Sequence, residues 1–182
     1  QYDASEVARL FPDYVQGEQC LILLVHEGPA PRVDAEIRAV ESIMVELGLD
    51  PADAAAAEGW MSHRNNVPEW RDLLEQGLIA DTIEVSGTWS QIDAIYEDVV
   101  AALKTVPDCV NSSAHSSHVY RSGVNLYFTF ACMPEDASVM GDRYLESWNR
   151  ALTATAEAGG GIAHHHGSGR LRRDYLLHDL GD

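Results

Sequence analysis

Three consecutive histidines, His164, His165 and His166, are the residues of this chain best suited to chemistry near neutral pH. Imidazole has an unperturbed pKa between pH 5 and 8, so such a cluster can move protons, bind anions or ligate a metal. Gly167-Ser168-Gly169 follows directly, and glycines let a backbone approach a ligand closely. The alternative interpretation is a solvated loop in which the histidines have no role.

A metal site and a proton relay make different demands on this triplet. In an extended segment His164 and His166 would face one side and His165 the other. Two imidazoles on one side need at least a third ligand, often a carboxylate, and no spaced acidic residue accompanies the triplet. We therefore expect no metal here and favour proton handling.

Other candidates depend on their surroundings. Tyr127 lies in an alternating apolar pattern, and a phenol with an ordinary pKa of about 10 needs imidazole partners to be useful in proton transfer. His115 and His118, taken alone, are predicted to be surface residues. A basic cluster of Arg170, Arg172 and Arg173 follows the glycines and favours anion binding. For Arg172 or Arg173 we expect a solvated helix face instead.

Composition describes a folded, acidic domain. The chain has 182 residues, 46% hydrophobic and 23% charged, which is typical of one globular domain. Its 29 acidic against 12 basic residues argue against a nucleic-acid partner, because phosphate binding needs a basic face. No apolar run approaches the roughly 18–20 residues of a membrane helix, so we expect no transmembrane segment. Three cysteines are too few for a disulfide framework, which predicts a cytoplasmic protein.

Hydrophobic periodicity predicts alternating strands and helices. A continuous apolar run over 20–26 predicts a central, buried strand. The other expected elements are, in order, a helix over 33–47, a loop or short strand over 60–66, a helix opened by Val67-Pro68, a strand over 79–86, a helix starting at Gly87-Thr88, a hairpin of 109–120 with 124–133, a helix over 140–155, and a basic helix ending at Leu177.

This order indicates an α+β fold, in which an antiparallel sheet has helices packed on one face. In the second hairpin strand four residues should face the helices and the four between them should face away. The first set is Val124, Leu126, Phe128 and Phe130, and the second is Asn125, Tyr127, Thr129 and Ala131. We expect a cofactor or another domain to cover the second set, or solvent to reach it.

The stretch from residue 159 to residue 172 carries a resemblance to a known family. Gly159-Gly160-Gly161-Ile162-Ala163-His164-His165-His166-Gly167-Ser168-Gly169-Arg170-Leu171-Arg172 resembles the signature Gly-Gly-x-x-x-His-His-His-Gly-x-Gly-Lys-Leu-Arg of alkyldihydroxyacetonephosphate synthases, FAD enzymes of the vanillyl-alcohol-oxidase type. Val85-Ser86-Gly87-Thr88-Trp89 and Leu126-Tyr127-Phe128-Thr129-Phe130 are similar to two further family segments. The resemblance covers about residues 20–178.

The resemblance implies the ferredoxin-like cap domain of an FAD-linked oxidase. Residues 1–19 would be an N-terminal segment or linker from a missing FAD-binding domain. Residues 20–182 would be the substrate-binding cap domain, truncated at its C-terminus. The family reaction exchanges the acyl chain of acyl-dihydroxyacetone phosphate for a fatty alcohol in ether lipid synthesis, without net oxidation. The isolated fragment is then expected to be inactive.

The resemblance also implies roles for individual residues. The expected partners are a small phosphorylated or hydroxylated substrate, with a lipid chain in the synthases, and the chain's own FAD-binding domain; a homodimer is compatible with them. Catalytic roles fall on Tyr127, His164, His165 and His166. Contacts with the substrate phosphate fall on Arg71 and Arg64, and contacts with FAD fall on His166, Gly167, Gly169 and Arg170.

Two alternatives stay open. Related D-2-hydroxy acid dehydrogenases of the glycolate or D-lactate type carry His-x-x-Asp-Gly-Asn-x-His and Glu-His-Gly, which supply metal ligands. Here Tyr127 stands in place of the second metal histidine and His165 in place of the glutamate. These replacements favour the synthase-like interpretation. The other alternative is a freestanding α+β module whose histidines hold a metal.

Overall fold

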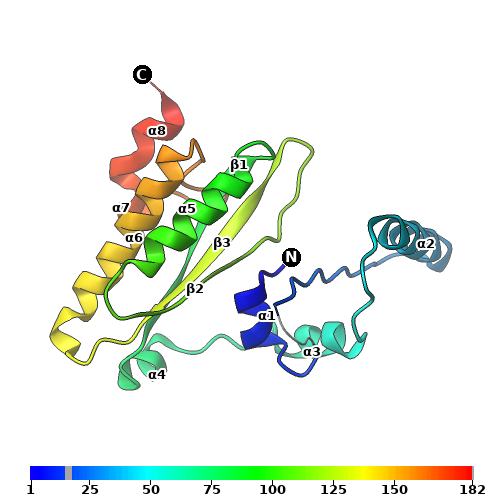
Figure 1. Cartoon of the computed structure of the whole chain (residues 1–182), viewed down its shortest axis with the longest axis horizontal. Helices are drawn as coiled ribbons and strands as arrows, with labels where there is room; N and C mark the ends of the chain where they lie inside the picture. The colour runs from blue at the N-terminus through cyan, green and yellow to red at the C-terminus, as the bar shows by residue number, and fades with distance from the viewer. Residues whose placement is uncertain (15–17, 182) are drawn as a thin grey trace.

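A three-stranded antiparallel sheet forms the centre of the molecule (Figure 1). The computed structural model describes residues 1–14 and 18–181. The strands are β1 (Ile79–Thr88), β2 (Cys109–His115) and β3 (Gly123–Cys132), in the spatial order β1-β3-β2. The long middle strand β3 pairs with both neighbours, and Glu84 of β1 lies opposite Tyr127 of β3. The predicted antiparallel sheet is confirmed.

Two helices cover one face of this sheet, as the alternation in β3 predicts. They are α5 (Ile92–Lys104) and α6 (Met140–Glu157), which lie side by side across the strands (Figure 1). Phe128 and Phe130 are completely buried against them, together with Ile83 of β1. Burying such side chains supplies most of the driving force for folding, at about 1.5–3 kcal/mol each. The α+β fold with helices on one face is therefore confirmed.

The N-terminal third forms a second, smaller cluster beside β2. The helices of this third are α1 (Ala4–Leu10), α2 (Ala30–Leu47), α3 (Ala55–His63) and α4 (Trp70–Glu75), of which α4 contacts β1 instead of the cluster. Val7 and Phe11 of the α1 region pack with Leu21 and with Ala56 of α3. By contrast, α2 has no buried residue and lies away from the sheet (Figure 1). None of the described helices is long and apolar enough to cross a membrane.

Three predicted elements were wrong. The segment 20–26 is no central strand: only Leu21 forms a bridge, with Tyr2, and Leu24 is 54% exposed. The apolar run therefore lines the surface of the small cluster and not the main core. The loop or strand expected over 60–66 falls largely within α3. The helix expected to start at Gly87-Thr88 begins at Ile92, because Gly87 and Thr88 still belong to β1.

The C-terminal segment returns to the free edge of β1. After α6 the chain makes one antiparallel bridge, between Gly161 and Ser86, and continues through the histidines into three short helical turns. These are α7 (Gly169–Arg172), η2 (Arg173–Tyr175) and α8 (Leu176–Leu180); a further turn, η1 (Ala137–Val139), precedes α6. The histidines thus lie at the edge of the sheet.

Candidate active site

The loop that carries the histidines is fixed to β1 by main-chain and side-chain bonds. Ser86 N donates to Gly161 O at 2.9 Å, Gly161 N donates to Ser86 O at 2.8 Å, and Ser86 Oγ donates to Ala163 O at 2.9 Å. A Cβ at Gly161 would lie 2.7 Å from Ser86 Oγ, so a larger residue would displace the Ser86 side chain that holds the loop. The glycine run therefore serves the close approach of this loop to the strand.

Arg172 holds the other side of the loop. Its guanidinium donates to the carbonyl oxygens of Ile162 at 2.8 Å, Gly167 at 3.2 Å and Glu84 at 3.0 Å, and it stacks over Trp148 at 4.9 Å. The side chain is buried, so the interpretation of Arg172 as part of a solvated helix face was wrong. Its five donors suit several carbonyls at once, which makes it a structural clamp for the histidine loop.

A buried carboxylate that the sequence analysis missed lies beneath the histidines. Glu84 is 0% exposed and occupies the middle of β1. Its Oε1 lies 2.8 Å from His165 Nδ1, and its Oε2 accepts from the backbone N–H groups of His165 at 3.2 Å and His166 at 3.3 Å. The expectation that no acidic partner accompanies the triplet was wrong, because that partner lies some 80 residues earlier in the chain.

Asn125 fixes the orientation of this carboxylate. Its Oδ1 accepts from the backbone N–H groups of Ser117 at 3.3 Å and His118 at 2.9 Å, so its Nδ2 must point the other way. That Nδ2 donates to Glu84 Oε1 at 2.9 Å. Burial alone would raise the pKa of Glu84, but the hydrogen bonds from Asn125 and the His165 backbone, the charge of His166 and the contact with Tyr127 lower it to about 2. Glu84 is thus an anion at neutral pH.

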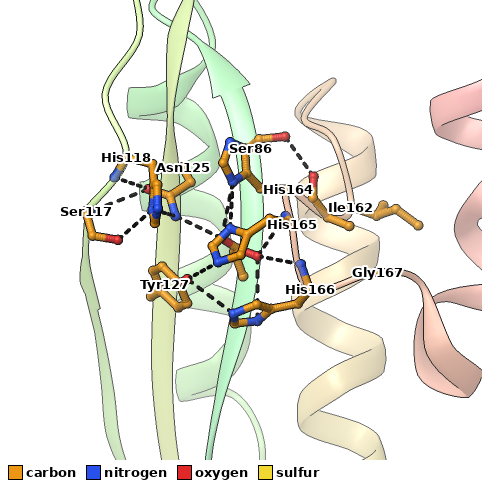
Figure 2. Close-up of polar contacts among 12 residues, drawn as sticks. Ser86, Ser117, His118, Asn125, Tyr127, Ile162, His164, His165, His166 and Gly167 are labelled. Carbon is orange, nitrogen blue, oxygen red and sulfur yellow. Dashed lines mark hydrogen bonds and ion pairs between the residues drawn. The ribbon is translucent and has the colours of Figure 1, made fainter. Parts of the chain in front are cut away.

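Tyr127 meets two of the three histidines (Figure 2). Its hydroxyl lies 3.2 Å from His165 Nε2 and 3.2 Å from His166 Nε2. Burial, then the charge of the nearby Glu84 carboxylate, raises the pKa of Tyr127 to about 12. The phenol therefore rests protonated, and a neighbouring imidazole must take its proton if it is to act as a base.

His164 lies beside the same carboxylate and extends the cluster toward His118. Its Nδ1 lies 2.9 Å from His165 Nδ1 and 3.5 Å from Glu84 Oε1. His118 is exposed, as expected, and its ring is tilted against those of His164 and His165, with centroids 5.4 Å and 4.7 Å away. One ligand atom from each of Glu84, His118, His164 and His165 falls within 4.8 Å of the others, a grouping that could hold a metal ion. A cavity of about 300 Å³ adjoins His164 and Ser86.

The structure brings together only some of the predicted site residues. Gly167 and Gly169 follow the histidines with left-handed backbones (φ of 73° and 56°), and open space surrounds both. Arg170 is exposed on the same loop. Arg71 is exposed on α4, and Arg64 lies over Trp60 at 5.4 Å; neither forms a hydrogen bond or ion pair with the histidines. Their phosphate-binding role stays a prediction.

A protein-family comparison decides the class. The family described as FAD linked oxidases, C-terminal domain, matches residues 5–182. The chain belongs to this family. The predicted resemblance to the C-terminal domain of an FAD-linked oxidase is therefore confirmed, and its parent family uses FAD.

Individual relatives of this FAD-linked oxidase domain fall in two groups. The chain is 32% identical, over 94% of its length, to the "Uncharacterized FAD-linked oxidoreductase YgcU" of Escherichia coli K12. It is 27% identical, over 82% of its length, to the alkyldihydroxyacetonephosphate synthase of Dictyostelium discoideum. It spans 38% of the first relative and 25% of the second. A solved alkyldihydroxyacetonephosphate synthase structure shares the fold, with a TM-score of 0.61 and 24% identity over 86% of this chain and 29% of that chain.

Proposed function

We propose that this chain is the substrate-facing part of an FAD-dependent enzyme resembling alkyldihydroxyacetonephosphate synthase. That enzyme would exchange the acyl group of acyl-dihydroxyacetone phosphate for an alkyl group in ether lipid synthesis. The observation that carries the proposal is the Tyr127 hydroxyl, 3.2 Å from two imidazole nitrogens. In this proposal Tyr127 exchanges a proton with the substrate, and His165 or His166 takes or returns it.

The exposed side of the histidine loop fits a flavin held mainly by another domain. His166, Gly167, Gly169 and Arg170 are all exposed, and a Cβ on either glycine would meet nothing within 4 Å. A flat ring can therefore approach this backbone closely. Bound FAD would supply the electron-accepting ring, while the residues of this chain orient the substrate and handle its proton. As an isolated chain we expect no turnover and no tight, stoichiometric binding of added FAD.

The test uses the complete enzyme that contains this chain. Tyr127→Phe removes the hydroxyl alone and should abolish turnover, as should His166→Ala, while circular dichroism and the melting temperature stay near those of the wild type. Val110→Ala on β2, which is 60% exposed, is a matched control that should leave turnover unchanged. Full activity in Tyr127→Phe would remove the proposed role of the phenol.

A second candidate is an FAD-linked oxidoreductase acting on a D-2-hydroxy acid. It is favoured by the 32% identity with a relative described as an oxidoreductase. An enzyme of this kind consumes an electron acceptor, whereas the synthase reaction does not. Measuring reduction of a dye by the complete enzyme, with acyl-dihydroxyacetone phosphate or with D-lactate, therefore separates the two candidates.

A freestanding metal-binding module is the third candidate, supported by the grouping of Glu84 with three histidines. Metal analysis of the purified chain tests it, because stoichiometric zinc or manganese would favour this candidate. We further propose a cytoplasmic enzyme, since Cys20, Cys109 and Cys132 are free thiols. A homodimer is compatible with the proposal, and light scattering of the complete enzyme tests it.

A further inference from the structure

We infer that Glu84 is a positioning residue that orients His165 as the proton acceptor for Tyr127. This inference rests on the proposed function, because it assigns a role within the same site. His165 lies between Glu84 and Tyr127 and contacts each with one ring nitrogen. Its Nδ1 is 2.8 Å from Glu84 Oε1, and its Nε2 is 3.2 Å from Tyr127 Oη. The three groups form a carboxylate–imidazole–hydroxyl chain.

The chemistry of the carboxylate sets the direction of this chain. An ionised carboxylate can only accept hydrogen bonds, so His165 Nδ1 must carry the proton that lies between it and Glu84. His164 Nδ1, at 2.9 Å, competes for that proton, but an anionic oxygen forms the stronger bond. A neutral imidazole with a proton on Nδ1 has a free electron pair on Nε2. Tyr127 therefore donates its hydroxyl proton to His165.

His166 takes the complementary place. The single hydroxyl proton of Tyr127 cannot point to both imidazoles, so His166 Nε2 must donate to the phenol oxygen if His165 Nε2 accepts. His166 Nδ1 lies 3.6 Å from Glu84 Oε2, which is too long for a hydrogen bond. Glu84 therefore does not fix which ring nitrogen of His166 carries the proton. The two histidines thus differ in role although both touch Tyr127.

The surroundings of Glu84 suit a histidine that becomes charged. Among the described residues no lysine or arginine side chain contacts this carboxylate; Arg172 reaches only its backbone oxygen. When the Tyr127 proton moves from Oη to His165 Nε2, His165 becomes a positively charged imidazolium. The buried Glu84 anion, 2.8 Å from its Nδ1, then stabilises that charge. No electron is transferred, the phenolate takes its replacement proton from the substrate, and Glu84 keeps its charge throughout.

The interatomic distances in this cluster are those of hydrogen bonds, and a bound zinc ion would have to spread the ligand atoms apart. Zinc bonds of 2.0–2.2 Å in a tetrahedral site place ligand atoms about 3.3–3.6 Å apart. The separations here are 2.8 Å between Glu84 Oε1 and His165 Nδ1 and 2.9 Å between the Nδ1 atoms of His164 and His165. Both are ordinary hydrogen-bond lengths.

The tautomer of His165 can be measured on this chain without substrate or flavin. Long-range ¹H–¹⁵N correlation spectra of histidine-labelled protein should show His165 protonated on Nδ1 and unprotonated on Nε2. Glu84→Gln should move His165 toward the Nε2-protonated form, because an amide group can donate to Nδ1. Glu6→Gln is the matched control: Glu6 is also buried and lies 3.0 Å from the Nδ1 of another histidine, His115, so this variant should leave the tautomer of His165 unchanged.

Two spectroscopic outcomes would overturn the inference. One is a wild-type His165 protonated on Nε2, and this result does not depend on whether any variant folds. The other is a stoichiometric shift of the His118, His164 and His165 signals on addition of Zn²⁺, which would make this cluster a metal site. Neither measurement involves turnover, so both are independent of the proposed reaction.

Kinetics of the complete enzyme give the second readout. Glu84→Gln should lower kcat roughly 10²-fold, at the lower end of what positioned proton transfer contributes, and change the pH profile while KM stays nearly constant. Glu84→Asp should restore part of kcat. A rise in KM alone would show that Glu84 only supports binding and would contradict the positioning role. Full activity of Tyr127→Phe would instead refute the proposed function, whatever the His165 tautomer.

Discussion

Two buried glutamates on the same face of the sheet show how one pairing of residue types serves two purposes. Glu6 of α1 is 1% exposed and lies 3.0 Å from His115 Nδ1, while Glu84 of β1 is 0% exposed and lies 2.8 Å from His165 Nδ1. In both glutamates burial opposes ionisation, and hydrogen bonds outweigh it, so that each pKa is lowered to about 2. Both carboxyl groups are therefore ionised at neutral pH.

The difference lies in the other partners. Glu6 has a permanent cation, Arg9, at 3.1 Å, and His115 only stacks its ring on Tyr127, with centroids 5.1 Å apart and planes 7° apart. Glu84 has no such cation among the described residues, and its histidine reaches the Tyr127 hydroxyl with its second nitrogen. The first pair fastens α1 to β2, whereas the second connects a buried charge to a hydroxyl that can react.

The largest expected effect is on turnover of the complete enzyme. His165→Gln should lower kcat by about 10²–10⁴-fold, the range that a positioned acid or base contributes. His115→Gln should lower it only a few-fold, because this side chain supports the Tyr127 ring without touching its hydroxyl. Steady-state kinetics on both variants make the measurement. Equal losses in the two variants would mean that the pairs do not differ in function.

The next effect is on stability. Glu84→Ala removes the acceptor of the Asn125 side chain and of two backbone N–H groups, and each unpaired buried donor costs about 1–3 kcal/mol. We expect a loss of about 3 kcal/mol in the free energy of unfolding, measured by urea denaturation of this chain. Glu6→Ala should cost about half as much, because His115 and Arg9 can turn to water. A larger loss for Glu6→Ala would reverse the ranking of the two sites.

Acid should destabilise the chain through both carboxylates. Each folded-state pKa, about 2, lies below the ordinary value of 4.5, so the folded protein binds fewer protons than the unfolded chain between these values. The stabilisation is fully present above about pH 5 and is lost as the pH falls toward 2. Glu6→Gln should therefore show a shallower decline of the urea midpoint with falling pH. Parallel declines in variant and wild type would contradict this assignment.

Part of this comparison could be predicted from the sequence. The alternation in β3 placed Tyr127 on the face away from the helices, and the histidine signature identified the loop beside it. Along β1 polar residues alternate with apolar ones, so Glu84 shares a face with Thr82 and Ser86. Its contact with the histidines depends on the pairing of Glu84 with Tyr127 and on the single bridge at Gly161, and local periodicity contains no information about either.

The small cluster was beyond prediction for a related reason. The run 20–26 has the composition of a buried strand, but Leu21 pairs only with Tyr2, and the core of the sheet is already filled by residues of α5 and α6. Arg172 was misjudged because basic side chains are usually solvated, whereas here three carbonyl oxygens and the Trp148 ring satisfy its charge.

The smallest expected effect tests whether the permanent cation matters to the structural pair. Arg9 is 48% exposed although Glu6 is buried, and a half-exposed cation contributes little because water screens its charge and its long side chain loses entropy. Arg9→Gln should therefore lower the free energy of unfolding by about 0.5 kcal/mol, and Arg173→Gln, at a fully solvated pair with Asp174, should change nothing measurable. A loss above about 2 kcal/mol for Arg9→Gln would show that His115 alone cannot compensate the Glu6 charge. Among the described residues the cationic side chains that contact the Glu84 carboxylate are histidines, so the ionisation of Glu84 would then need a further explanation.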